Sequence, residues 1–250
     1  MTASDPVLET RGLSKWFGGV RAVDAVDLAL PRGEIRALIG PNGAGKTTLF
    51  NMLTGQLRPD AGEVRLRGSR LTGLPPHAVW RRGVSRTFQI TATFASLTAL
   101  EHVQVARLSH RRRTYSLFRP AAGLEAEAAR GLLHQVALAE QAARPAAVLA
   151  YGDLKKLELA VALANDPEVL LLDEPTAGMA PGERGALMAL VARLARERAL
   201  TVLFTEHDMD AVFAVADTIM VLHQGRVIAS GAPAEVRADA LVQRVYLGEE

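Results

Sequence analysis

The sequence predicts an α/β protein built on a mainly parallel sheet. Short apolar segments with the length of strands alternate with helical segments in both halves of the chain, which is typical of parallel sheets. A glycine-rich loop at residues 40–47 joins one predicted strand to a helix, and two carboxylates, Asp173 and Glu174, directly follow another strand. A helical stretch at about residues 90–154 separates the two halves.

The composition is ordinary for a globular protein, with 49% hydrophobic and 22% charged residues among 250. A net charge of +2 gives no electrostatic case for binding nucleic acid or anionic lipid. The chain has no cysteine, which excludes disulfides, thiol catalysis and thiolate metal sites. Residues 1–8 lack the apolar core of a signal peptide, and no run approaches the roughly 20 apolar residues of a membrane span. We therefore expect any membrane connection to run through a partner.

In the first half of the chain, apolar–polar alternation and turns rich in Gly and Pro set the predicted elements. The predicted strands are 7–13, 26–30, 35–39, 63–68 and 83–88, and the predicted helices are 47–53 and 76–82. Arg36 conflicts with a strand that should be apolar throughout, so we expect it near a sheet margin where its guanidinium reaches water. Phe17 follows Trp16 near a turn, and its ring could stack on a flat base or simply pack.

Gly40 to Thr47 match G-x-x-x-x-G-K-[ST], the phosphate-binding P-loop, in the strand–loop–helix setting that the motif requires. Its glycines let successive backbone N–H groups point at one anion. The helix that follows directs its positive end to the same place. Lys46 is expected at the β- and γ-phosphates, and the Thr47 hydroxyl on Mg²⁺. The loop predicts a nucleoside triphosphate site.

In the second half, helical spacing and apolar runs set the elements. The predicted helices are 97–108, 124–143, 154–165, 181–197 and 233–238, and the predicted strands are 169–172, 201–205, 218–222 and 226–229. The cluster Arg111–Arg113, with Tyr115 and Phe118, could bind nucleic acid or a membrane surface, or be a solvated loop. Gly152 and Asp153 could cap the helix that follows or form a second anion site.

Polar side chains stand at the ends of three predicted strands. In a P-loop protein, Asp173 after its apolar strand reaches Mg²⁺, and Glu174 can take a proton from an attacking water. His207 either faces the γ-phosphate or is an ordinary surface histidine. Gln89 follows the strand at 83–88, a position usually taken by a solvated loop residue. Ligands belong at the carboxyl ends of such strands, where these side chains and the P-loop fall.

Together these residues resemble the ATP-binding subunit of an ABC transporter over nearly the whole chain. Gly40–Thr47 is similar to the Walker A motif, Gln89 to the Q-loop, Leu149–Asp153 to the signature, Val169–Asp173 with Glu174 to Walker B and its catalytic glutamate, and His207 to the switch histidine. Arg-Thr-Phe-Gln at 86–89, Leu-Ala-Tyr-Gly-Asp and the closing Tyr-Leu-Gly-Glu resemble the branched-chain amino-acid importer subgroup.

The resemblance implies a single nucleotide-binding domain, 1–250, of the P-loop NTPase (RecA-like) type, with a core at about 1–88 and 155–250. It adds an antiparallel β subdomain and a helical insert at about 90–154. The implied ligands are ATP and Mg²⁺, with catalytic roles for Glu174, His207 and Gln89 and metal contacts from Thr47, Gln89 and Asp173. The implied nucleotide contacts are Phe17, Gly40, Pro41, Asn42, Gly43, Ala44, Gly45, Lys46, Thr47, Thr48 and, from a second chain, Ala150, Gly152 and Asp153.

By the same resemblance, two related or identical domains pack head to tail around two ATP molecules. Gln89 would link the nucleotide site to the insert, where transmembrane permease subunits dock at the cytoplasmic face of the membrane. A separate solute-binding protein would act indirectly. Hydrolysis would then drive import of branched-chain amino acids or related small solutes.

Four residues depart from the family pattern. Ala150 replaces the signature serine, Asp153 and Leu154 replace glutamines, and Ala180 replaces the D-loop aspartate. An alternative function is a non-transport ABC ATPase acting on nucleic acid or ribosomes, motivated by Arg111–Arg113; the near-neutral charge argues against nucleic acid as a partner. A P-loop kinase or GTPase would leave the signature and His207 unexplained.

Overall fold

Two β-sheets form the scaffold of the computed structural model, which describes residues 5–87, 94–111, 123 and 125–247. The larger sheet has the strand order β10-β9-β3-β8-β7-β6. All its neighbouring strands run parallel except the β9–β10 pair, which is antiparallel. The bounds are β3 Ile35–Ile39, β6 Val84–Arg86, β7 Val169–Asp173, β8 Thr201–Thr205, β9 Thr218–His223 and β10 Arg226–Gly231.

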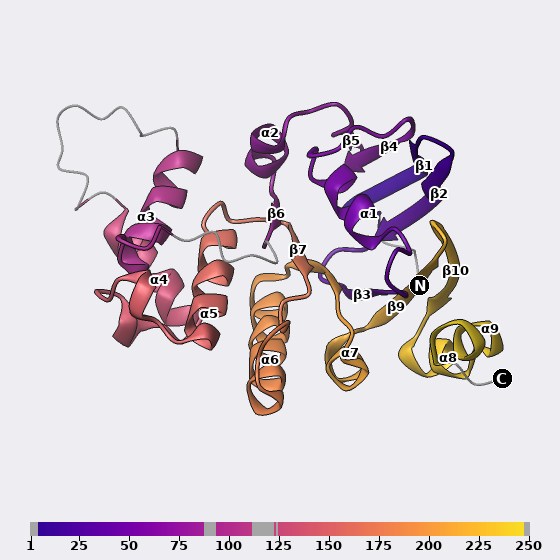
Figure 1. The fold of residues 1–250 in the computed structure, drawn as a ribbon. Helices are drawn as coiled ribbons and strands as arrows, with labels where there is room; N and C mark the ends of the chain where they lie inside the picture. Colours follow the sequence, from indigo (N-terminus) through magenta and orange to yellow (C-terminus); the bar gives the residue numbers. More distant parts are fainter. Residues whose placement is uncertain (1–4, 88–93, 112–122, 124, 248–250) are drawn as a thin grey trace.

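The smaller sheet is antiparallel, with the order β2-β1-β4-β5 (Figure 1). Its strands are β1 Leu8–Phe17, β2 Val20–Leu30, β4 Ala61–Leu66 and β5 Ser69–Arg70. Both strands of the β1–β2 hairpin are longer than predicted, and β4 starts two residues early. Together the two sheets confirm the predicted fold class, a mainly parallel core with an antiparallel β subdomain and a helical insert.

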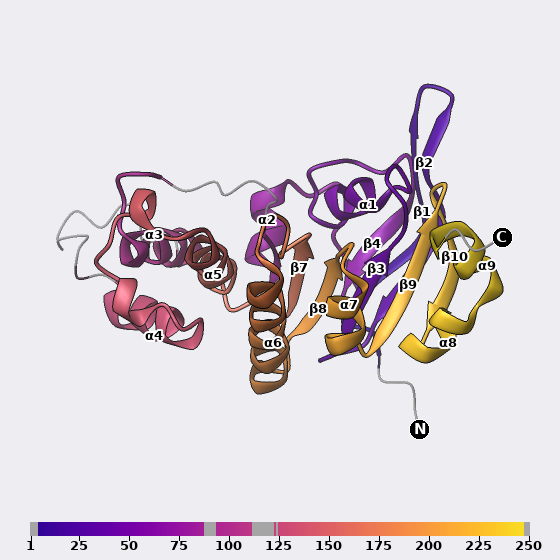
Figure 2. The ribbon, with the colours of Figure 1, turned by 60° about the horizontal axis from the view of Figure 1, so that its bottom comes forward.

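The helices fall into layers and one separate group (Figures 1 and 2). Helices α6 (Pro181–Arg198) and α7 (Met209–Val215) cover one face of the large sheet, and α1 (Lys46–Leu53) lies on the other. Helices α3 (Ala99–His110), α4 (Ala126–Gln135) and α5 (Tyr151–Ala162) form a group beyond the β6 edge. The remaining helices are α2 (Pro76–Arg81), α8 (Pro233–Ala238) and α9 (Ala240–Val242), with the short turns η2 (Ala139–Gln141), η3 (Ala146–Val148) and η4 (Gln243–Leu247).

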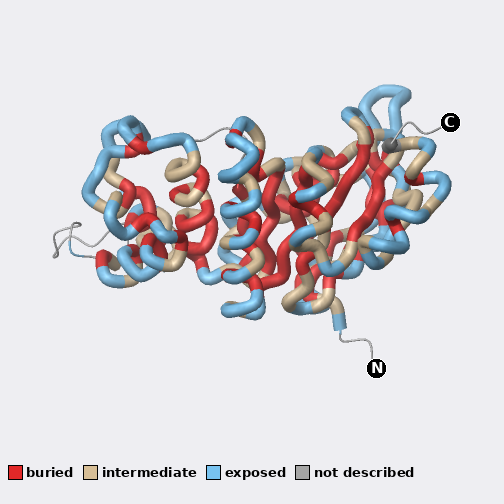
Figure 3. The backbone as a smooth tube through the Cα atoms, turned by 90° about the horizontal axis from the view of Figure 1, so that it is seen from below, coloured by how far each residue is buried: buried red, intermediate tan, exposed pale blue. Residues whose placement is uncertain are grey.

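Alternate residues of the central strands enter two different cores. Leu170 and Leu172 of β7 pack with α6, whereas Val169 and Leu171 pack with α1 and the antiparallel sheet. Since side chains alternate along a strand and both faces are covered, the whole strand must be apolar, as the run Val169–Leu172 predicts. Figure 3 shows this burial concentrated along the central strands.

Arg36 does not lie at a sheet margin, so that expectation is wrong. Its strand, β3, has β9 on one side and β8 on the other. The guanidinium is accommodated because it pairs with Glu34 at 2.8 Å and donates to the Thr218 hydroxyl at 2.8 Å. Paired charges tolerate burial that an isolated charge does not.

Helix bounds differ from the predicted ones where capping or chain reversal intervenes. In place of the predicted helix 124–143, the structure has the shorter α4, Ala126–Gln135. The helix stops there because Ala137 takes a left-handed φ of 55°. Helix α5 begins at Tyr151, three residues early, and α7 was not predicted. Within the described ranges, no helix has both the length and the apolar character needed to cross a membrane.

Candidate active site

The P-loop forms a turn between β3 and α1 and leaves its amides open. In the described part of the chain, the N–H groups of Lys46, Thr47 and Thr48 at the start of α1 donate to no other protein group. Helix N-termini leave such donors for an anion. The Ala44 carbonyl accepts the Gly225 amide at 2.9 Å, which ties the loop to the β9–β10 turn.

Two loop glycines are required by close backbone contacts. A Cβ at Gly40 would lie 2.1 Å from the Leu222 carbonyl oxygen, and one at Gly45 would lie 2.2 Å from the Ala22 carbonyl oxygen. Gly45 also has a φ of 106°, which residues with a Cβ rarely adopt. The surrounding strands therefore enforce the loop conformation.

Lys46 is buried at the start of α1 and folds back over the loop. Its Nζ donates to the carbonyl oxygens of Gly40 at 2.6 Å and Pro41 at 3.1 Å. Burial lowers the pKa of the ammonium, and the nearby charges of Glu174 and Asp173 act in the opposite direction. The structure thus brings the predicted phosphate-binding lysine and the two strand-end carboxylates into one electrostatic neighbourhood.

Asp173 ends β7 and is 6% exposed. One carboxylate oxygen accepts the Thr205 hydroxyl at 2.9 Å, and the other accepts an Arg86 N–H at 2.7 Å. Neither partner has a role predicted from the sequence. Both residues stand at the carboxyl ends of strands, and that position was the available signal.

Glu174 and His207 lie in contact. The Nε2 of His207 is 3.1 Å from a carboxylate oxygen of Glu174. Glu174 has a left-handed φ of 48°, held because its N–H donates to both the carbonyl and the hydroxyl of Thr205, at 3.1 and 3.0 Å. This conformation turns the chain at the strand end.

Glu206 is a further positioning group, directly after β8 and before His207. It is buried and accepts the N–H and the hydroxyl of Thr176, at 2.8 and 2.7 Å, and the N–H of His207 at 3.2 Å. One carboxylate therefore joins the segment after Glu174 to the segment that carries His207.

Phe17 ends β1, and its ring is half exposed, with the Lys15 ammonium 5.6 Å from its centroid. It pairs with Val20 across the β1–β2 hairpin. The backbone of this hairpin reaches the P-loop at Ala22, which lies against Gly45. An exposed ring on this hairpin is compatible with stacking on a flat base.

The signature residues start helix α5, but Gly152 and Asp153 do not cap it. Ala150 is the N-cap residue and supplies no side-chain bond, because it has no hydroxyl. Asp153 lies in the first turn and pairs with Lys156 at 3.0 Å. Figure 1 shows α5 grouped with α3 and α4, with β6 and β7 between it and α1.

Gln89, Arg112, Arg113, Tyr115 and Phe118 lie outside the described residues. Arg111 is described, and it pairs with Glu125 at 3.3 Å.

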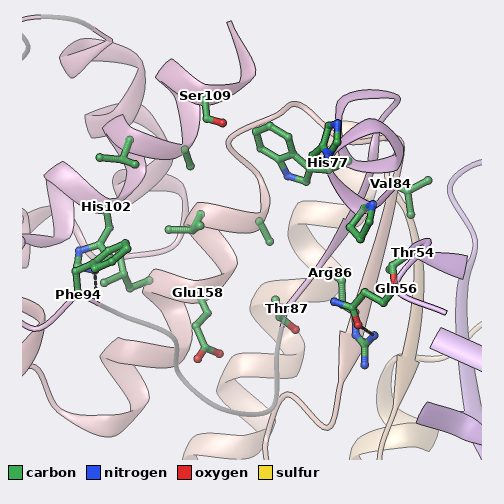
Figure 4. A pocket seen from close by; sticks show the side chains of 17 residues that line it. Thr54, Gln56, His77, Val84, Arg86, Thr87, Phe94, His102, Ser109 and Glu158 are labelled. Atoms are coloured by element: carbon green, nitrogen blue, oxygen red, sulfur yellow. Dashed lines mark hydrogen bonds between the residues drawn. The ribbon is translucent and has the colours of Figure 1, made fainter. Parts of the chain in front are cut away.

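A groove of about 520 Å³ separates α2 and β6 from the α3–α5 group (Figure 4). Its walls are mainly apolar and include Trp80, Phe94, Val105 and Leu157. Arg86 at the end of β6 and Thr87, the residue after it, also line it. The groove therefore begins beside the side chain that contacts Asp173.

The donor set fits a magnesium nucleotide. Open amides and a buried ammonium suit phosphate oxygens, and a Thr47 hydroxyl with a nearby carboxylate suits a hard cation that takes its other ligands from phosphate and water. The described residues contain no cluster of three or more His, Asp or Glu that would hold a metal alone.

Fold and site together define a P-loop nucleotide-binding protein. Residues 23–177 match the ABC transporter family, and residues 226–250 match the family described as branched-chain amino acid ATP-binding cassette transporter. The chain belongs to the ABC transporter family as one of its ATP-binding proteins.

Two curated relatives are similar over almost their full length. The high-affinity branched-chain amino acid transport ATP-binding protein BraF of Pseudomonas aeruginosa is 43% identical over 98% of this chain and 99% of its own. The corresponding protein LivG of Escherichia coli is 42% identical with the same coverage. A crystal structure of a nucleotide-free ATP-binding cassette superposes with a TM-score of 0.86 at 30% identity, covering 98% of this chain and 100% of that one. These matches confirm the resemblance stated from the motifs.

Proposed function

We propose that this chain is the ATP-hydrolysing subunit of a transporter that imports branched-chain amino acids or related small solutes. The solute class rests on the 42–43% identity to BraF and LivG over 98% of the chain. The hydrolytic role rests on one observation, the 3.1 Å contact between Glu174 and His207 beside the P-loop strand end.

The proposed mechanism divides the work among the P-loop, the residues at the strand ends and Phe17. The P-loop amides and Lys46 hold the phosphates, and Phe17 stacks on the base. Glu174 accepts the proton of the attacking water, and His207 holds Glu174 in position relative to the γ-phosphate. Mg²⁺, when bound, neutralises developing charge on the phosphates. Thr47, Asp173 and Gln89 are its proposed protein contacts.

We assign the apolar groove to the transmembrane permease. A segment from an integral membrane subunit would bring apolar side chains to Trp80, Phe94 and Val105, of which Phe94 and Val105 are largely exposed in this chain. Exposed apolar surface of this kind marks interaction sites. The helical insert at about 90–154 supplies one wall, and docking there would hold the chain at the cytoplasmic face of the membrane.

The first experiment is co-purification of the tagged chain from gently solubilised membranes. Multispanning permease subunits, a second ATP-binding chain and a solute-dependent link to a binding protein are expected. Recovery with ribosomes or nucleic acid and no permease would contradict the transport function and revive the alternative.

In the purified complex, Glu174→Gln should lower ATP turnover by on the order of 10²–10⁴-fold, the range for loss of a general base. Nucleotide binding should persist, because the P-loop is unchanged. Glu197→Gln is the matched control, since that carboxylate lies exposed on α6 and pairs only with Arg193 among described residues. Turnover unaffected by Glu174→Gln would rule out the proposed base.

A further inference from the structure

Arg86 connects three elements around the Walker B carboxylate. From the end of β6 it pairs with Asp173 of β7 at 2.7 Å and donates to the Asn51 side-chain oxygen in α1 at 2.6 Å. Its guanidinium also lies 5.5 Å from the centroid of the Phe50 ring. These contacts fix the Arg86 guanidinium between the P-loop helix and the strand that carries Asp173.

The Arg86–Asp173 pair is withdrawn from solvent. The two side chains are 6% and 7% exposed. In such surroundings the charge on one partner is balanced mainly by the other, and removing either leaves a costly buried charge. Because Thr205 takes the second oxygen of Asp173, protein groups already satisfy both oxygens of the carboxylate that the proposed function assigns to Mg²⁺.

We infer that Arg86 is a positioning residue that competes with the divalent cation for Asp173 and so sets how strongly the metal tightens nucleotide binding. Two cations that share one carboxylate repel each other, and the repulsion is larger in a buried site than in water. The guanidinium therefore keeps Asp173 neutralised and oriented until a metal nucleotide arrives, at the cost of weaker metal affinity. This inference rests on the proposed function.

The test compares ADP binding in Mg²⁺ with ADP binding in EDTA, by calorimetry on the full chain. ADP avoids turnover. The dissociation constant in EDTA divided by that in Mg²⁺ therefore reports the metal's contribution alone. Arg86→Gln should raise that ratio by about tenfold, as removal of one close charge implies. Arg86→Lys is the matched control, because it keeps the charge, and its ratio should stay within about twofold of the wild type.

A purely structural role for Arg86 gives a different result. Both variants would then weaken ADP binding equally with and without Mg²⁺, the ratio would not change, and the inference would be overturned. If Arg86→Gln does not fold, Asn51→Asp is the second variant. It puts another carboxylate against the same guanidinium, whose nitrogen lies 2.6 Å from the Asn51 side-chain oxygen. The new carboxylate would then compete with Asp173 for the guanidinium. The ratio for this variant should rise about threefold, and an unchanged ratio would also overturn the inference.

The experiment separates the inference from the function beneath it. If Mg²⁺ does not tighten ADP binding to the wild-type chain, the proposed metal site fails. If Mg²⁺ tightens binding equally in the wild type and all variants, only the role of Arg86 fails.

Discussion

Thr205 shows how one hydroxyl can organise two acidic residues. It donates to the Asp173 carboxylate at 2.9 Å and accepts the Glu174 N–H at 3.0 Å. The same hydroxyl thus orients the carboxylate assigned to the metal and holds Glu174 in its left-handed conformation. A residue without a role in chemistry can in this way determine where the proposed base points.

Thr205→Val should separate shape from hydrogen bonding, because valine nearly matches threonine in volume. We expect a loss of about 1–3 kcal/mol in stability, since buried polar partners are left unsatisfied. ATP turnover of the complex should fall at least tenfold, because a rise of about 1.4 kcal/mol in the activation free energy lowers the rate by that factor. Thermal unfolding and turnover measure the two effects. Thr205→Ser restores the hydroxyl, and if it behaves like valine the hydroxyl is not the cause.

At this scale, sequence reasoning was strongest where the chemistry is local. The P-loop positions are adjacent in the chain, and their spacing alone describes a phosphate cradle. The partners of Asp173 are 87 and 32 positions away, at Arg86 and Thr205. Only the pairing of β6 and β8 with β7 brings them together, so no spacing rule could have found them.

At the scale of elements, the predicted helices differ from the observed ones mainly in where they begin. Helix α5 begins at Tyr151 because Ala150 is extended at the N-cap position, and alanine there gives no sequence signal. Helix α7 has seven residues, too few for an apolar period to stand out. Its start was nevertheless marked, since Asp208 caps it through the Ala211 N–H at 3.2 Å.

Asp208 offers an element-scale prediction because it caps α7 directly after His207. The Ala211 N–H and then the Arg184 side chain lower the pKa of this carboxyl below its ordinary value of 3.8. A lowered folded-state pKa contributes stability above the ordinary value and loses it as pH falls through the folded one. Asp208→Ala should cost about 1 kcal/mol near neutral pH through loss of the cap.

Asp208→Asn is its control, because asparagine caps helices about as well but carries no charge. Its deficit relative to the wild type should disappear as pH falls below 3.8 towards the folded-state pKa. Thermal unfolding across pH 3 to 7 measures both variants. A deficit that does not change with pH would show that charge at Asp208 contributes nothing.

At the scale of the whole molecule, one chain does not bring its signature segment to its own P-loop. Figures 1 and 2 place α5 in the outer helical group, with β7 between it and α1. A site that uses both segments needs a second chain, which agrees with the head-to-tail dimer that the family resemblance implies.

Glu174→Gln should therefore dimerise when Mg²⁺ and ATP are added, because nucleotide binds and is not consumed. Light scattering should show a doubling of mass with ATP and none with ADP. Lys46→Ala is the control that should remain monomeric, since it loses the phosphate-binding ammonium. A Glu174→Gln chain that stays monomeric at saturating ATP would argue for an obligatory partner of different sequence.

The groove also contains a natural optical probe. Trp80 lies in its wall and meets the His110 ring edge-on, with centroids 5.5 Å apart. The chain has two tryptophans, and the other, Trp16, precedes Phe17 in β1. Figure 1 shows β1 far from the group α3–α5. Indole fluorescence responds to the polarity around the ring. Emission from Trp80 would therefore change when a partner covers the groove, and emission from Trp16 would change if a nucleotide base stacks on Phe17. An unlabelled chain, with one indole replaced at a time, would thus report separately on the groove and on the β1–β2 hairpin that carries Phe17.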